Sequence, residues 1–174
     1  MGAALSLAGF IGVPLGMSVV GAITTAKEVK GWYTTLKKPS WTPPNWLFGP
    51  AWTTLYTCMG TASWLVFQQG GLAKQALPLA VYGAQLLANF AWTPLFFGKH
   101  EMGLAMVDNV AMWGGIAACI KLFHPVSPAA AYLMVPYLGW VTYASALNYN
   151  IWANNPPEGK WTAGGGKKKG AASD

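Results

Sequence analysis

The side chains that could do acid–base or metal chemistry in this sequence are few and scattered. Asp108 is the one acid inside a long apolar segment, and Cys58 and Cys119 are single thiols in other apolar segments. His100 and His124 lie in expected loops, and two histidines alone make a poor metal site. The sequence has no paired carboxylates at membrane depth and no glycine-rich phosphate loop. These residues disfavour hydrolysis, metal redox chemistry and ion conduction, and they predict no metal site.

Four polar residues are expected at membrane depth: Asp108, Gln85, Asn89 and Asn148. An ionisable group is costly there, which makes Asp108 a functional-site candidate. A structural carboxylate near one end of its helix is the competing interpretation. The three amides must find hydrogen-bond partners inside the protein or line a wet cavity, because an unpaired amide is unfavourable in an apolar medium.

Aromatic side chains are the abundant recognition groups in this sequence, which contains ten Trp and seven Tyr. Several lie along the expected helices or near their ends: Trp52, Trp92, Trp113, Trp140, Tyr143, Tyr149 and Trp152. A Trp-lined interior suits a large, flat, apolar ligand such as a tetrapyrrole or a sterol. Helix packing and interfacial aromatic belts produce the same composition, so both interpretations stay open at this point.

The elements that position these residues are predicted to be membrane-spanning helices. The 174 residues are 53% hydrophobic and 9% charged, with a mean hydropathy of +0.33, whereas ordinary soluble domains are about 25% charged. Five segments are long and apolar enough to cross a bilayer: 4–26, 46–68, 75–97, 102–123 and 128–152. We therefore expect an all-α membrane protein, a bundle of five transmembrane helices, as one domain over residues 1–155. Residues 156–174, rich in Gly and Lys, are predicted to be a disordered tail.

The longest connection, 27–45, is predicted to form a structured lid over one mouth of the bundle. It runs into residues 41–52, which hold three Trp and three Pro. Pro39, Pro43 and Pro44 fix their own φ and push the preceding residue out of the α region, so 37–44 should be extended and rigid. Tryptophan prefers a membrane interface, where its N–H stays hydrated.

The lysines predict the orientation in the membrane. All eleven basic residues are Lys, and the side holding 27–45, 98–101 and the C-terminus carries every one except Lys74 and Lys121. The positive-inside rule then places the C-terminus in the cytosol. Arg is absent and the lysines lie in loops and the tail, which argues against nucleic-acid binding.

Two stripes of small residues could let helices approach closely. Ala80, Ala84 and Ala88 lie on one face of the third expected helix. They predict either a seam within the bundle or a homodimer face. Gly12 and Gly16 in the first expected helix are predicted to serve internal packing.

Short motifs along nearly the whole chain resemble those of the translocator protein family, also called the tryptophan-rich sensory protein or peripheral benzodiazepine receptor group. They occur in the family's order and spacing over about residues 5–155: Trp32-Tyr33, Lys38-Pro39-Ser40-Trp41, Phe48-Gly49-Pro50, Asn89-Phe90-Ala91-Trp92, Pro136-Tyr137-Leu138 and Leu147-Asn148-Tyr149. The resemblance implies five transmembrane helices with a first loop closing over a ligand pocket. Several segments look closer to eukaryotic members, which implies the mitochondrial outer membrane as the first expectation, with a plastid, endoplasmic reticulum or bacterial outer membrane as alternatives.

The resemblance also implies a ligand and the residues that bind it. The ligands would be porphyrins such as protoporphyrin IX and haem, together with synthetic isoquinoline- or benzodiazepine-type compounds, with no required cofactor. The matching positions are Ala22, Phe48, Gly49, Trp52, Asn89, Trp92, Ala111, Trp140, Ala144 and Leu147. The family's sterol motif needs a basic residue soon after Tyr149, and 150–154 supplies none, so the sequence does not support sterol binding there.

Three functions are compatible with these observations. The first is a membrane receptor or transport-type protein that binds tetrapyrroles and other flat apolar ligands, and that resembles its family in forming a homodimer through the third helix. The second is an enzyme that degrades porphyrin in light, which the resemblance would assign to Trp52 and Trp140. The third is a membrane scaffold or sterol-handling protein that acts through partners.

Overall fold

The computed structural model describes residues 2–155, and the tail predicted for 156–174 lies outside these described residues. The described chain forms six α-helices and one π-helical turn, with no strand among its residues. In order they are α1 (Gly2–Lys30), α2 (Trp32–Thr35), α3 (Asn45–Phe67), α4 (Gly71–Thr93), η1 (Pro94–Gly98), α5 (Met102–Phe123) and α6 (Pro128–Asn154). The all-helical prediction is confirmed.

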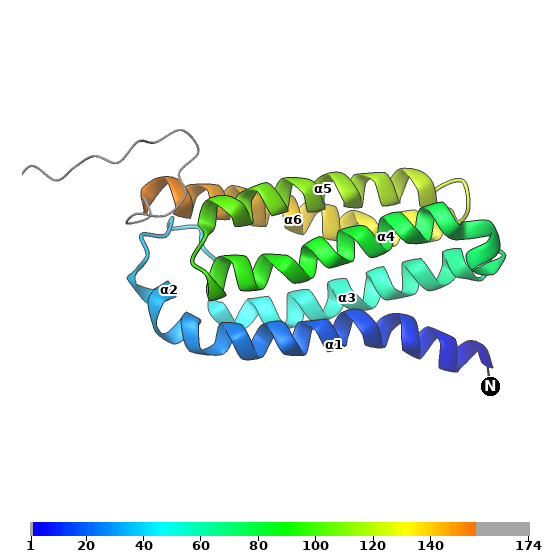
Figure 1. Cartoon of the computed structure of the whole chain (residues 1–174), viewed down its shortest axis with the longest axis horizontal. Coiled ribbons are helices and arrows are strands. Elements are labelled where there is room, and N and C mark those ends of the chain that lie inside the picture. The colour runs from blue at the N-terminus through cyan, green and yellow to red at the C-terminus, as the bar shows by residue number, and fades with distance from the viewer. Residues whose placement is uncertain (1, 156–174) are drawn as a thin grey trace, which may run out of the picture.

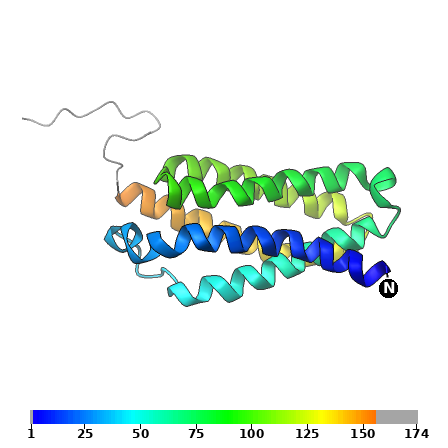
Figure 2. The same ribbon diagram turned by 60° about the horizontal axis from the view of Figure 1, so that its bottom comes forward.

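Five long helices lie side by side along one axis (Figure 1). α5 packs between α4 and α6, while α3 packs against α1 on one side and α6 on the other. The same elongated arrangement is seen in the rotated view (Figure 2). By length and composition, two helical segments of the described chain qualify as membrane spans, Ala4–Lys30 and Met102–Phe123.

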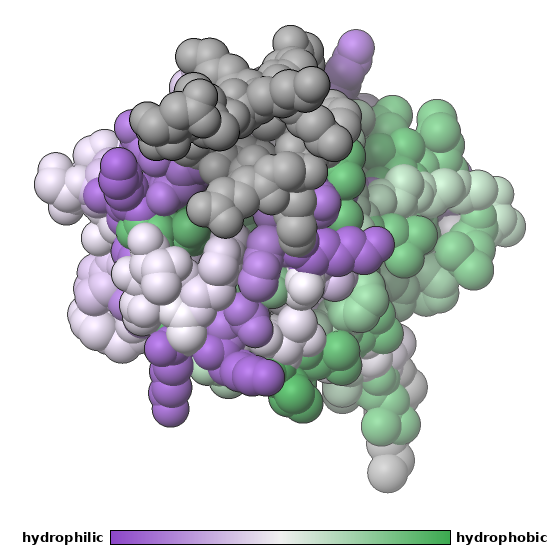
Figure 3. Space-filling model, turned by 60° about the vertical axis from the view of Figure 1, so that its left-hand side comes forward, coloured by the Kyte–Doolittle hydropathy of each residue, from purple (hydrophilic) through white to green (hydrophobic). Residues whose placement is uncertain are grey.

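Polar and apolar surfaces are separated along the molecule. The end that carries α2 is largely hydrophilic, and a hydrophobic flank extends behind it (Figure 3). Large apolar side chains on the long helices are exposed, including Leu5, Ile23, Leu87 and Val107. Apolar side chains gathered on a flank and a polar cap at one end are what a bilayer requires of a protein that crosses it.

The lid follows the predicted path. Residues 37–39 and 42–44 have no regular structure, and α3 begins directly after Pro44, whose ψ is 144°. Asn155 at the end of α6 holds the lid in place: its Oδ1 accepts from the Lys37 N–H at 2.8 Å, and its Nδ2 donates to the Lys37 carbonyl at 2.9 Å. The Tyr143 hydroxyl donates to the Trp41 carbonyl at 2.7 Å. The proline-based prediction that 37–44 is not helical is confirmed.

A close contact between α1 and α3 involves a glycine that the stripe analysis did not select. A Cβ added at Gly60 on α3 would lie 2.7 Å from both the Ile11 Cα and the Phe10 carbonyl oxygen on α1. Gly12 and Gly16 are exposed, with nothing within 4 Å of an added Cβ. The prediction that these two glycines serve internal packing is therefore wrong, because the face of α1 that carries them points away from α3.

Candidate functional site

A cavity of about 420 Å³ lies inside the bundle, next to the lid. Every helix of the bundle contributes to its wall. Nine of the ten residues predicted for the ligand site line it: Ala22, Phe48, Gly49, Trp52, Asn89, Trp92, Trp140, Ala144 and Leu147. Ligand sites for small molecules occupy about 300–1,000 Å³ and are mostly apolar, so this cavity has the size and the lining of one.

Aromatic rings make up much of the cavity wall. Trp92 on α4 stacks on Phe96 of η1, with ring centroids 4.8 Å apart and an interplanar angle of 13°. Trp52 on α3 stacks on Tyr56 at 5.3 Å and meets Trp140 edge-to-face at 6.4 Å. The π-turn that carries Phe96 begins at Pro94, which has no N–H to continue the α-helical pattern. These rings present flat apolar faces to anything the cavity holds.

A buried hydrogen-bond network lies at one part of this wall. The Tyr56 hydroxyl donates to Asn89 Oδ1 at 2.8 Å, and Asn89 Nδ2 donates to the Tyr137 hydroxyl at 2.7 Å. The network joins α3, α4 and α6, and Tyr137 is fully buried. Asn89 therefore satisfies the expectation that amides at membrane depth find partners, and it fixes the position of Tyr56.

Other polar atoms of the wall lack a partner within residues 4–155. They are the indole Nε1 atoms of Trp92 and Trp140, Asn109 Nδ2 and Asn148 Oδ1, and all four residues line the cavity. Asn148 uses its own Nδ2 to donate to the Met102 carbonyl at 3.1 Å. Buried polar groups are nearly always hydrogen-bonded in native proteins. These four atoms are therefore exceptions: they belong to lining residues, but they are buried beneath the surface of the cavity wall.

The lid end of the cavity is fixed by contacts between α1, α2 and the loop before α5. Tyr33 is buried there, and burial, with a smaller effect of the Tyr143 phenol, raises the pKa of Tyr33 above its usual value. The His100 ring stacks on Trp32 at 3.9 Å, and its Nε2 lies 3.0 Å from Glu28 Oε2. The mouth of the cavity therefore has a neutral phenol, Tyr33, beside the stacked rings of Trp32 and His100.

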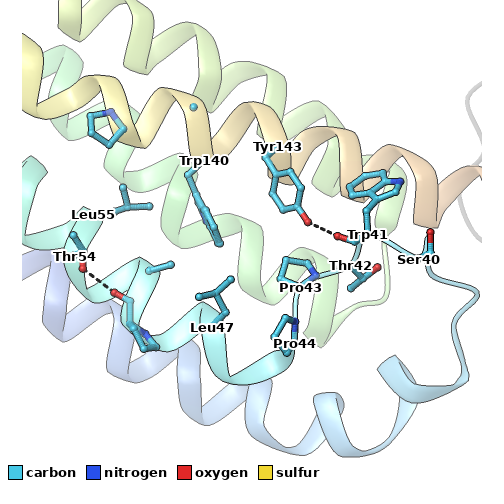
Figure 4. Close-up of a pocket in the computed structure, with 14 residues that line it drawn as sticks. Ser40, Trp41, Thr42, Pro43, Pro44, Leu47, Thr54, Leu55, Trp140 and Tyr143 are labelled. Atoms are coloured by element: carbon cyan, nitrogen blue, oxygen red, sulfur yellow. Dashed lines mark hydrogen bonds between the residues drawn. The ribbon is translucent and has the colours of Figure 1, made fainter.

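A separate groove of about 850 Å³ lies on the outside of the bundle, between the lid, α3 and α6 (Figure 4). Its walls include Pro43 and Pro44 of the lid and Gly139 of α6. Trp140 is the one described residue that lines both the groove and the inner cavity. Its ring contacts Phe48 on the cavity side and Tyr143 on the groove side, with centroids 5.9 Å away in each case. The Trp140 indole is therefore the partition between the two spaces.

Comparison with known proteins gives the family. The sequence profile described as the TspO/MBR family matches residues 10–153. The chain belongs to this family of membrane proteins. It is 44% identical to the translocator protein of Bos taurus over 149 residues, covering 84% of this chain and 88% of that one. It is 45% identical to the translocator protein of Homo sapiens over 138 residues, covering 78% and 82%.

Bacterial members of the TspO/MBR family are also similar to the chain. The tryptophan-rich protein TspO of Chlorobaculum tepidum is 40% identical over 153 residues, which is 87% of this chain and 97% of that one. The family match over residues 10–153 includes the residues that line the cavity. The resemblance inferred from the short motifs is therefore confirmed.

Ala111 is the predicted site residue that the structure places elsewhere. It is exposed on α5 and does not line the cavity, whereas Asn109 and Met112 of the same helix do. Residues three apart share a helix face, so 109 and 112 turn inward together and 111 turns outward. Asp108 does not line the cavity either, and its Oδ2 is buried without a partner in the described chain. The geometry of this family member therefore gives no ligand-binding role to Asp108.

Several lining residues were not assigned to the ligand site from sequence: Lys30, Tyr33, Tyr56, Asn109 and Asn148. Asn148 had been identified as a buried amide, but without a choice between packing and the cavity. Asn109 adjoins Asp108 in an evenly apolar helix, and only the rotation of α5 reveals that it faces inward. Conversely, Trp113 and Tyr149 are 42% and 57% exposed, so these two aromatic residues belong to the outer surface.

Proposed function

We propose that this TspO/MBR family member binds flat, apolar ligands of the tetrapyrrole class, such as protoporphyrin IX and haem, in the cavity under the lid. The observation that carries the proposal is the pair of aromatic stacks, Trp92 on Phe96 and Trp52 on Tyr56, in the wall of one 420 Å³ cavity. Planar conjugated molecules gain offset-stacked or edge-to-face contacts against such rings. A receptor or a transport-type role both begin with this binding step.

The test is a titration in lipid nanodiscs with protoporphyrin IX, read as quenching of Trp fluorescence. We expect a saturable isotherm with a dissociation constant in the micromolar range or below. Gly49 lines the cavity and Gly139 lines the groove, and an added Cβ meets nothing within 4 Å at either. Gly49→Phe should weaken binding at least about tenfold, while Gly139→Phe should leave it unchanged. A linear, unsaturable response, or the reverse pattern in the two variants, would refute binding in the cavity.

A light-dependent porphyrin-degrading enzyme is the second candidate, because Trp52 and Trp140 meet edge-to-face in the same wall. An indole next to an excited porphyrin can take part in electron transfer. The discriminating measurement is illumination of the bound complex followed by product analysis. New tetrapyrrole products that disappear in a Trp52→Phe/Trp140→Phe variant would favour the enzyme.

A membrane scaffold or sterol-handling role is favoured if Gly49→Phe abolishes binding and leaves the cellular phenotype intact.

We further propose that all five long helices cross the bilayer, with the C-terminus in the cytosol and the mitochondrial outer membrane as the location. The lysine asymmetry supports this orientation: the last turn of α1 holds Lys27 and Lys30, and the described loops on the same side hold Lys37, Lys38 and Lys99. A protease site appended after Asp174 should be cut by protease added to intact mitochondria. Full protection of that site would show that the orientation is inverted.

A homodimer through α4 is the remaining proposal. Ala80 and Ala84 are exposed on α4, and Ala88 is half-buried. Ala84→Phe should weaken a dimer that uses this face by about 1–3 kcal/mol, the range typical of overpacking, while porphyrin binding inside each bundle should persist. Mass photometry in nanodiscs measures the dimer fraction. Val107→Phe, on an exposed face of α5, is the control, and an equal effect of the two variants would remove α4 as the interface.

A further inference from the structure

The outer groove runs along α3 and α6, away from the lid. Its lining starts at residues 40–44 of the lid and reaches Leu55 on α3 and Pro136 on α6 (Figure 4). Leu47 and Leu55, which both line it, are eight residues apart, so the groove follows about 12 Å of helix. A hydrocarbon core of about 30 Å gives each leaflet of a bilayer about 15 Å. The groove therefore has nearly the length of one leaflet.

Most polar groups that line the groove are already bonded within the protein or buried. Thr42, Thr54 and Tyr143 donate their hydroxyl hydrogens to backbone carbonyls, at 2.7, 3.0 and 2.7 Å. The Trp140 Nε1 atom is buried beneath the surface. Four lining residues are prolines, which have no N–H: Pro43, Pro44, Pro50 and Pro136. The groove therefore favours an occupant that needs no hydrogen bond.

The two facing walls of the groove are apolar and leave space between them. The ring of Trp41 meets Tyr143 edge-to-face at 5.5 Å, and Tyr143 contacts Trp140 at 5.9 Å, so one wall is a row of aromatic rings. Leucines of α3 lie across from these rings (Figure 4). Gly139 lines the groove without a side chain, and a Cβ added there meets nothing within 4 Å. This shape fits a narrow, flexible hydrocarbon chain.

We propose that the groove binds one acyl chain of a bilayer phospholipid, from the leaflet on the lid side. Its walls lie on the outside of the bundle, and apolar surface that faces a bilayer is covered by lipid chains rather than by water. Ser40 and Trp41 are exposed at the lid end of the groove. They lie level with the polar part of such a lipid, where tryptophan is enriched. This site is separate from the cavity under the lid, and it requires that α3 and α6 cross the bilayer, as proposed above.

The experiment is photo-cross-linking in nanodiscs of phosphatidylcholine, a small fraction of which carries a diazirine in the middle of one acyl chain. Mass spectrometry of the digested protein then locates the label. Residues 47–55 and 136–143 should carry at least about threefold more label per residue than the exposed Leu87 and Val107, because a bound chain stays longer than a passing one. Equal labelling of the groove and these two positions overturns the proposal. Absence of label from all of them would also refute the crossing of the bilayer.

Moving the diazirine along the acyl chain tests the orientation in the wild-type protein. A diazirine next to the ester should label residues 40–44 of the lid, and one near the terminal methyl group should label Leu55 and Pro136. The reverse order, or no order, would contradict a chain that enters from the lid side.

Gly139→Phe should lower the labelling of the groove to the level of the exposed positions, because the new ring occupies the space of the chain. Gly12→Phe on α1 is the matched control. Gly12 is exposed, an added Cβ meets nothing within 4 Å, and the residue lines neither the groove nor the cavity. Groove labelling that persists in Gly139→Phe, or that falls equally in both variants, overturns the assignment. Porphyrin binding in the cavity should persist in Gly139→Phe, which shows that this variant is folded.

Two other occupants of the groove would give different results. If a sterol that carries the same photoreactive group labels the groove more strongly than the phospholipid and displaces it, the groove is a sterol site and the proposal is wrong. If mass photometry shows a dimer that Gly139→Phe disrupts and Gly12→Phe does not, a second copy of the chain covers the groove instead. Preferential labelling of the groove by the phospholipid in monomeric protein supports the acyl chain.

Discussion

Gly60→Ala is expected to lower the free energy of unfolding by about 1–3 kcal/mol, the range for a core contact with no room for an added atom. The new Cβ would lie 2.7 Å from the Ile11 Cα and the Phe10 carbonyl oxygen. Both are backbone atoms, so no side chain can rotate to relieve the overlap, and α1 must move away from α3. The measurement is the thermal unfolding midpoint in nanodiscs, followed by intrinsic fluorescence.

The matched control is Gly83→Ala, in the middle of α4. An added Cβ at Gly83 meets nothing within 4 Å, and Ala is favoured over Gly inside a helix by up to about 1 kcal/mol. Gly83→Ala should therefore leave the midpoint unchanged or raise it. If the two variants unfold at the same temperature, α1 does not approach α3 as closely as this structure places it.

The positions of the helices and of the lid along the chain could be predicted because they depend on local sequence patterns. Apolar segments of spanning length located every long helix to within a few residues. The prolines of the lid, Pro39, Pro43 and Pro44, restrict the backbone whatever surrounds them. The family resemblance then supplied nine of the residues that line the cavity, of which residue type alone had singled out Trp52, Trp92, Trp140 and Asn89.

The rotation of each helix could not be predicted, and the errors have that common cause. A membrane helix is apolar on its lipid face and on its packed face, so hydrophobic periodicity does not show which side turns inward. Gly12 and Gly16 have the four-residue spacing typical of packed helix faces, yet they face away from α3. Ala111 and Asn109 differ by two positions on α5, and only the packing against α4 and α6 decides that Asn109 reaches the cavity.

Asn89→Leu is expected to have a comparably large effect on stability, again about 1–3 kcal/mol. The substitution keeps the branched shape of the side chain, although the two methyl groups of Leu are larger than the amide oxygen and nitrogen. It removes the acceptor of the Tyr56 hydroxyl and the donor to the Tyr137 hydroxyl, and it leaves both phenols buried without these partners. Interhelical hydrogen bonds in membrane proteins contribute modestly to stability on average. Most of the loss of unfolding free energy would therefore come from leaving the two buried hydroxyls unpaired. Ligand-free protein must be used, because Asn89 and Tyr56 also line the cavity.

The triple variant Asn89→Leu/Tyr56→Phe/Tyr137→Phe separates these two contributions. When every partner of a buried network is replaced by an apolar group of similar shape, the cost can be close to zero. The triple variant should therefore be more stable than Asn89→Leu alone, although it carries two more substitutions. If stability instead falls with each added Phe, the network holds α3, α4 and α6 together by its hydrogen bonds. Recovery would mean that the network's main effect is to fix Tyr56, and with it the Trp52 stack, in the cavity wall.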